Sequence, residues 1–128
     1  MLKEHHPRLH YNSLTHAWRG FYTTVSSTSG RNLRLEITLA VFALIFAYYF
    51  QFDLLKQVTV ITTALLVIGF EMFNTALEEI VNAIHPERHP LAKAAKDASA
   101  TAVFIICVLA TIVGLYLFLP PFLNLFGY

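Results

Sequence analysis

The most apolar part of the chain reads Val58-Thr-Val-Ile-Thr-Thr-Ala-Leu-Leu-Val-Ile-Gly-Phe-Glu71-Met-Phe-Asn74-Thr-Ala-Leu-Glu78-Glu79-Ile-Val-Asn82. Glu71, Asn74 and Glu78 stand at i, i+3 and i+7, so they share one face of a helix. If that helix crosses a bilayer, an ionised carboxylate near its centre costs about 2.5–3.5 kcal/mol. The pattern therefore indicates that a metal, a cationic partner or a proton is paired with these side chains.

The composition is that of an integral-membrane protein. Hydrophobic residues make up 56% of the 128 residues, charged residues 13%, and the mean hydropathy is +0.57, which exceeds that of soluble domains. We expect a single integral-membrane domain over residues 1–128. The net charge of +1 excludes a strongly basic nucleic-acid binder. Cys107 is the sole cysteine, so no intrachain disulfide is expected, and the first residues lack the apolar segment of a cleavable signal peptide.

Three segments are long and apolar enough to span a membrane, which takes roughly 17–25 residues. They are predicted at about 35–52, 58–84 and 98–119. An amphipathic helix is predicted before them, at about 13–29, with Leu14, Trp18, Phe21 and Tyr22 on one side. It is expected to lie on the membrane surface, either as a mere anchor or as a substrate contact. The Ser- and Thr-rich residues 23–30 are predicted to form a loop or helix break.

Basic residues give the predicted orientation. One group precedes the first span, and a second group (Arg88, Lys93 and Lys96) lies between the second and third spans. By the positive-inside rule, the N-terminus and the second loop are cytosolic and the C-terminus is outside.

The depth of the carboxylates suggests separate roles. At 1.5 Å per residue, Glu78 lies roughly 9 Å and Glu71 roughly 20 Å from the cytosolic helix end near Ile84. Magnesium prefers carboxylate and phosphate oxygens, which suits Glu78 as a metal ligand and Glu71 as a proton acceptor. Lys96, in the basic loop, suits a polyphosphate. A proton-coupled pathway and a helix-packing network are the alternatives that these residues leave open.

Several motifs together resemble the bacterial integral-membrane diacylglycerol kinase and undecaprenol kinase family. They are Ala17-Trp18-Arg19-Gly20, Glu71-Met-Phe-Asn74-Thr-Ala-Leu-Glu78, His89 and Ala92-Lys-Ala-Ala-Lys96-Asp97. The resemblance covers nearly the whole chain. It implies an all-α homotrimer in the bacterial inner membrane, with active sites at subunit boundaries near the cytosolic face. It also implies a Mg²⁺-dependent lipid kinase that transfers the γ-phosphoryl group of ATP to a lipid hydroxyl.

The resemblance also implies roles for single residues. Glu71 corresponds to the catalytic base, Asn74 to a residue that organises the same site, and Glu78 to a magnesium ligand. Lys96 corresponds to a contact of the nucleotide phosphates and Asp97 to a contact of the base or sugar. The further expected contacts are Glu87, Arg88 and His89 with the nucleotide, and Arg34, Glu36, Trp18 and Arg19 with the lipid.

One departure from the family pattern leaves other readings open. Family members usually carry a second metal carboxylate a few residues before the arginine that matches Arg34, and here Gly30 holds that place. Asn82 likewise stands where the family has an aspartate. A non-catalytic relative of the same fold, or a slow kinase, is therefore the alternative, and a proton-coupled transporter subunit is a third reading. Diacylglycerol and undecaprenol both present a primary hydroxyl, so the residues do not distinguish them.

Overall fold

The computed structural model describes residues 7–84 and 89–127, and within these ranges the chain forms four helices and no strand. They are α1 (Pro7–Ser26), α2 (Arg31–Tyr49), α3 (Leu54–Ile84) and α4 (Pro90–Leu125). Helices α2, α3 and α4 are each long and apolar enough to cross a membrane. The predicted all-α fold with three candidate membrane spans is thereby confirmed.

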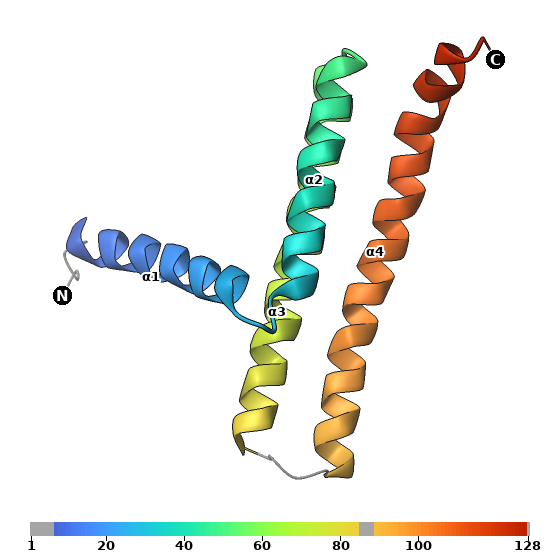
Figure 1. Cartoon of the computed structure of the whole chain (residues 1–128). Helices are drawn as coiled ribbons and strands as arrows, with labels where there is room; N and C mark the ends of the chain where they lie inside the picture. Colours follow the sequence, from blue (N-terminus) through green and yellow to red (C-terminus); the bar gives the residue numbers. More distant parts are fainter. Residues whose placement is uncertain (1–6, 85–88, 128) are drawn as a thin grey trace, which may run out of the picture.

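Helix α3 is the centre of the bundle, because it packs against both α2 and α4. Helix α1 leaves the bundle sideways from the start of α2, while α3 and α4 continue well past this point (Figure 1). The 31 residues of α3 measure roughly 46 Å. The hydrocarbon layer is about 30 Å thick, so α3 is longer than an upright span requires.

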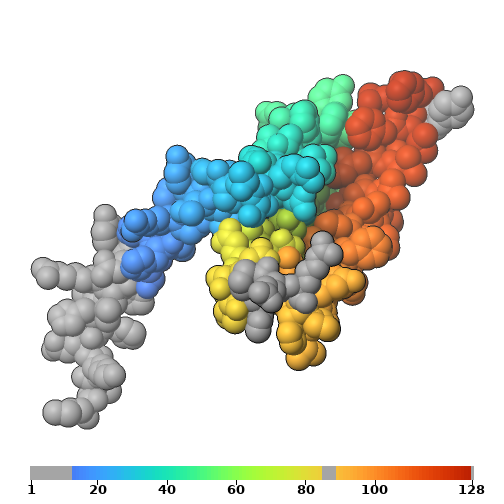
Figure 2. Space-filling view, turned by 60° about the horizontal axis from the view of Figure 1, so that its bottom comes forward, coloured from blue at the N-terminus to red at the C-terminus, as the bar shows by residue number. Residues whose placement is uncertain are grey.

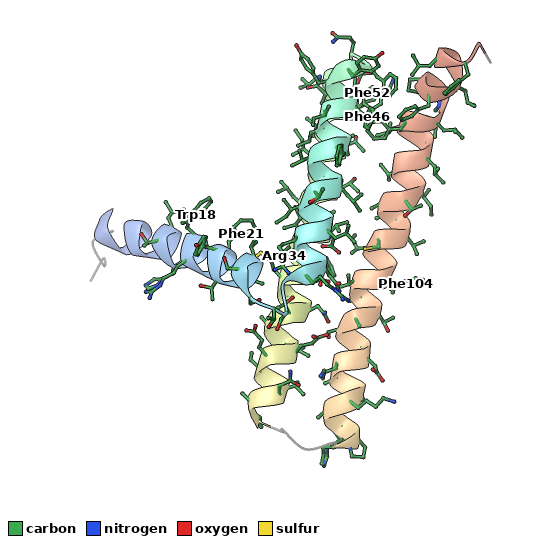
Figure 3. The ribbon with its side chains drawn as sticks, viewed as in Figure 1. Trp18, Phe21, Arg34, Phe46, Phe52 and Phe104 are labelled. Atoms are coloured by element: carbon green, nitrogen blue, oxygen red, sulfur yellow. The ribbon has the colours of Figure 1, made fainter. Side chains whose placement is uncertain are left out.

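The outer surface of the bundle is apolar. Leu39, Phe42, Phe104 and Ile112 are all more than half exposed. Few hydrophobic residues are buried, and the main cluster consists of Ala47, Phe52, Val60 and Leu117. Near it, aromatic rings connect the end of α2 to α4, where Figure 3 labels Phe46 and Phe52. An outward apolar surface around a small core is what a lipid environment requires.

Helix α1 begins at Pro7, earlier than the predicted start near residue 13, and ends at Ser26, before the predicted end near residue 29. Residues 23–26, expected in a loop, are helical, and only residues 27–30 form the break. The hydroxyls of Thr23 and Thr24 donate to the carbonyl oxygens of Arg19 and Gly20, at 2.8 and 2.9 Å. Bonds to the preceding turn satisfy these hydroxyls inside a helix, so their presence does not end it.

The turn from α1 to α2 is fixed by backbone contacts. Arg34 Nη1 donates to the carbonyl oxygens of Val25, at 2.7 Å, and Ser27, at 2.8 Å, which places a cation at the C-terminal end of α1. Gly30 is buried, and a Cβ there would overlap the carbonyl oxygen of Thr24. The close approach of the two backbones therefore explains why glycine occupies this position.

Helices α3 and α4 begin with side-chain caps. The Asp53 carboxylate accepts a bond of 3.0 Å from the backbone N–H of Lys56, and this bond holds the pKa of Asp53 below its ordinary value. His89 precedes α4, and its Nδ1 accepts from the N–H of Leu91 at 3.2 Å. Pro90 occupies the first turn of α4, where its missing backbone N–H costs no helical hydrogen bond.

Candidate active site

The polar face of α3 is largely buried. Glu71 is 3% exposed and Asn74 7% exposed, while Glu78 is half-buried. The Asn74 amide nitrogen Nδ2 donates to Glu78 Oε1 at 3.3 Å, so the two side chains form one step of a ladder along the helix. These three residues occupy the face of α3 that packs inside the bundle, where a polar group requires a partner.

Two side-chain hydrogen bonds join α4 to α3, one to Asn74 in this ladder and one to Asn82 beyond it. Ser99 Oγ donates to Asn74 Oδ1 at 2.6 Å, and the Ser99 side chain is 9% exposed. Further towards the loop, Lys96 Nζ donates to Asn82 Oδ1 at 3.1 Å. The two bonds hold the start of α4 in a fixed register against the end of α3.

Helix α2 approaches Glu71 from the other side. The Asn32 side chain lies within hydrogen-bonding reach of the Glu71 carboxylate. Glu36, one turn further along α2, is close enough to interact electrostatically with Glu71. Since Asn32 stands in the first turn of α2, Glu71 lies at the level where α1 turns into α2. Three helices thus meet around Glu71 and Asn74.

Glu36 borders an apolar cavity. The cavity measures about 290 Å³ and lies between α2, α3 and α4, lined mainly by small or aliphatic side chains such as Ala40, Val67 and Gly114. Glu36 Oε1 lies 4.0 Å from Cys107 Sγ, and within the described part of the chain its buried Oε2 has no hydrogen-bond partner. This lining suits hydrocarbon rather than a nucleotide.

Magnesium is the metal that the sequence predicts, and Glu78 fits it. Among residues 13–84 and 89–127, no three His, Cys, Asp or Glu side chains gather as a protein-only metal site would require. Magnesium does not need such a group, because it binds through one or two carboxylates and completes its shell with substrate phosphates and water. Glu78 is half-buried, so its carboxylate is open to a ligand while still held by Asn74.

The remaining predicted residues fall into different places. Lys96 is half-buried and Asp97 exposed at the start of α4, with His89 at its cap. Arg34 faces the α1–α2 turn, where it is engaged by the end of α1. Trp18 and Arg19 are exposed on α1, and Figure 3 shows Trp18 far from α4. The expected contacts Glu87 and Arg88 lie outside the described residues.

The structure adds two residues that the sequence reasoning missed, Ser99 and Asn32. Ser99 lies three residues after Lys96 and so shares its face of α4, which was a usable signal. Asn32 carries no comparable signal, because its approach to Glu71 depends on how α2 packs on α3.

Comparison of the sequence with known proteins identifies the family. The family model described as prokaryotic diacylglycerol kinase matches residues 15–118. Undecaprenol kinase of Bacillus subtilis is 34% identical over 120 residues, which cover 92% of this chain and 96% of the relative. Diacylglycerol kinase of Synechocystis is 34% identical over 114 residues, or 88% of this chain and 64% of the relative. Diacylglycerol kinase of Escherichia coli K12 is 30% identical over 98 residues, or 76% and 78%.

The matched residues include the whole of α2 and α3 and therefore the whole Glu71–Asn74–Glu78 ladder. They also include the part of α4 that supplies Lys96 and Ser99. With its three candidate membrane spans and its buried polar ladder, the chain belongs to the prokaryotic diacylglycerol kinase family.

Proposed function

We propose that this lipid kinase transfers the γ-phosphoryl group of ATP to the primary hydroxyl of a membrane lipid alcohol, either diacylglycerol or undecaprenol, with Mg²⁺. The observation that carries the proposal is the position of buried Glu71. On one side of it lies the apolar cavity next to Glu36, and on the other lie Glu78 and Lys96. A lipid and a nucleotide can therefore approach Glu71 from opposite directions along α3. The names of the relatives, undecaprenol kinase and diacylglycerol kinase, support the same substrates.

Glu71 is the proposed general base. Its carboxylate would accept the proton of the lipid hydroxyl as that oxygen attacks the γ-phosphorus, and ADP would leave from the opposite side. Asn74, one turn away, would hold the Glu78 side chain in place and connect it to α4 through its bonds to Glu78 and Ser99. Phosphoryl transfer requires mainly positioning and charge neutralisation, so this small set of groups is sufficient.

Glu78 would hold Mg²⁺, which when bound neutralises charge on the phosphates. Lys96 would add a point charge beside the phosphates, and its bond to Asn82 holds the ammonium on the side that faces α3. Asp97 would contact the base or sugar, with His89, Glu87 and Arg88 close to it in sequence.

The membrane placement follows from α1. Leu14, Trp18 and Tyr22 are spaced four residues apart and are each about two-thirds or more exposed, so one face of α1 has no partner in the bundle. Figure 2 shows α1 standing off to one side of the bundle. We propose that this face lies in the cytosolic interface of the bacterial inner membrane, with the C-terminus outside. Glu71 would then lie at headgroup depth. Arg34, Glu36, Trp18 and Arg19 would face the lipid, and a homotrimer would complete the site.

The test is a phosphorylation assay with purified protein, labelled ATP, Mg²⁺, and either diacylglycerol or undecaprenol in mixed micelles. We expect Glu71→Gln to lower kcat by about 10²–10⁴-fold, the usual contribution of general base catalysis. Glu79→Gln is the matched control, because Glu79 follows Glu78 directly but is exposed, and it should stay within about twofold of the wild type.

Absence of labelled lipid with either alcohol, from folded wild-type protein at saturating Mg²⁺, would refute the proposal. That result would instead support a non-catalytic relative, which Gly30 first suggested. The transporter alternative predicts proton flux in liposomes that Glu71→Gln abolishes.

A further inference from the structure

We propose that Ser99 is a positioning residue of this kinase, whose hydroxyl anchors the Asn74 amide in the orientation that faces Glu78. The inference rests on the proposed function for its effect on catalysis, but its structural part is independent of any activity. It is carried by the 2.6 Å bond from Ser99 Oγ to Asn74 Oδ1, in a region where both side chains are buried.

An asparagine amide has nearly the same shape in either orientation, so packing alone does not select which end faces Glu78. The ionised Glu78 carboxylate only accepts, so it favours the orientation in which Nδ2 faces it and donates to Oε1 at 3.3 Å. In this orientation Oδ1 faces α4, where the Ser99 hydroxyl donates to it and anchors the amide. In the reversed orientation, Oδ1 would face the carboxylate, and two acceptors would repel each other. Ser99 thereby holds the Asn74 amide where its N–H donates to the proposed metal ligand.

The cross-helix bond distinguishes Ser99 from other hydroxyls on α4. Its oxygen lies 2.9 Å from the carbonyl oxygen of Lys96, which is the bond that a helical serine commonly makes to the preceding turn. Thr101 is exposed, and its hydroxyl donates only to the preceding turn of its own helix, to the carbonyl oxygen of Asp97 at 2.7 Å. Thr101 is therefore a control that removes a hydroxyl from the same helix without touching α3.

Removal of the Ser99 hydroxyl should affect the chemical step more than substrate binding. The Asn74 oxygen would be left buried without its donor, and the amide would be free to turn away from Glu78. Ser99 itself lies on α4, one turn beyond Lys96, and its side chain is not among the groups expected to touch either substrate. We therefore expect Ser99→Ala to lower kcat about tenfold, with both KM values within about twofold of the wild type. Ser99→Thr keeps the hydroxyl and should restore most of kcat, and Thr101→Val should leave both parameters unchanged.

A second measurement reads the amide directly and needs no activity. The chain contains five asparagines, so protein labelled with ¹⁵N-asparagine gives five pairs of side-chain amide signals, and the Asn74→Ala variant identifies the pair of Asn74. In Ser99→Ala we expect hydrogen exchange at the Asn74 amide to become about tenfold faster, because its bond to Glu78 is no longer held in place. Thr101→Val should leave that rate as in the wild type.

The proposal requires both changes. Unchanged Asn74 exchange in folded Ser99→Ala protein would overturn it, whatever happens to kcat. Faster exchange with unchanged kcat would overturn the functional part. If the wild type phosphorylated no lipid, the proposed function would fail, while the exchange rates would still decide whether Ser99 anchors Asn74.

Discussion

Replacing Gly30 by alanine should destabilise the junction between α1 and α2. A Cβ at this position would overlap the carbonyl oxygen of Thr24 and lie 3.0 Å from its carbonyl carbon and 3.3 Å from the carbonyl oxygen of Val25. All three are backbone atoms at a helix end, so they cannot move aside as a flexible side chain does. Overpacking of this kind costs about 1–3 kcal/mol. The upper half of that range is expected, because a shift of Val25 also disturbs its bond with Arg34.

The matched control is Gly20→Ala, in the interior of α1. A Cβ there meets no atom within 4 Å, so alanine should stabilise the helix by about 0.5–1 kcal/mol through its lower conformational entropy. Both variants make the same chemical change within one helix and its turn. The free energy of unfolding in mixed micelles, followed by circular dichroism and by fluorescence of the single tryptophan, Trp18, should move in opposite directions.

The reasoning is refuted if Gly30→Ala is as stable as the wild type. Gly30→Glu extends the test, because it restores the carboxylate that family members usually carry there. Its Cβ meets the same carbonyl oxygen, so we expect a lower free energy of unfolding. We also expect the Mg²⁺ concentration for half-maximal phosphorylation to stay unchanged. A lower half-maximal Mg²⁺ concentration, together with the free energy of unfolding of the wild type, would mean that the turn accepts a side chain, contrary to its geometry.

Three further predictions concern the groups around the site. Arg34→Gln should lower the free energy of unfolding by about 1 kcal/mol, since it weakens an exposed charged bond pair at the end of α1, and equal chemical denaturation midpoints would contradict this. Asn82→Ala should raise the KM for ATP about 2–10-fold by releasing Lys96, with an unchanged unfolding midpoint, and a change confined to the KM for lipid would count against it. Removal of Mg²⁺ by a chelator should abolish phosphorylation reversibly while the circular dichroism stays constant, because the helices pack through apolar contacts, and loss of helix would show that the metal is structural.

Much of the candidate site could be predicted because it lies on one helix. The spacing of Glu71, Asn74 and Glu78 determines their common face without any knowledge of neighbouring helices. Ser99 and Asn32 could not be placed in this way, since each reaches α3 from another helix and its contact depends on rotation and register. For Trp18 and Arg19, the local pattern was informative about secondary structure but not about position in the fold. Their amphipathic pattern predicted a helix, but not that it would point away from the polar ladder.

Gly30 illustrates the same distinction. From sequence it is only a missing carboxylate, because a family pattern compares side chains and a glycine has none. The structure explains the glycine, since two backbone segments approach more closely at this turn than a Cβ permits.

The helical class, the three apolar spans and the polar face of α3 could be predicted, because hydrophobicity and the 3.6-residue period are local properties of the chain. The folded structure was needed to show which groups meet Glu71 and Asn74, the level of Glu71 relative to α1, and why glycine stands at the turn. These depend on distances between segments far apart in the chain, and such distances are set by how the side chains of three helices pack together.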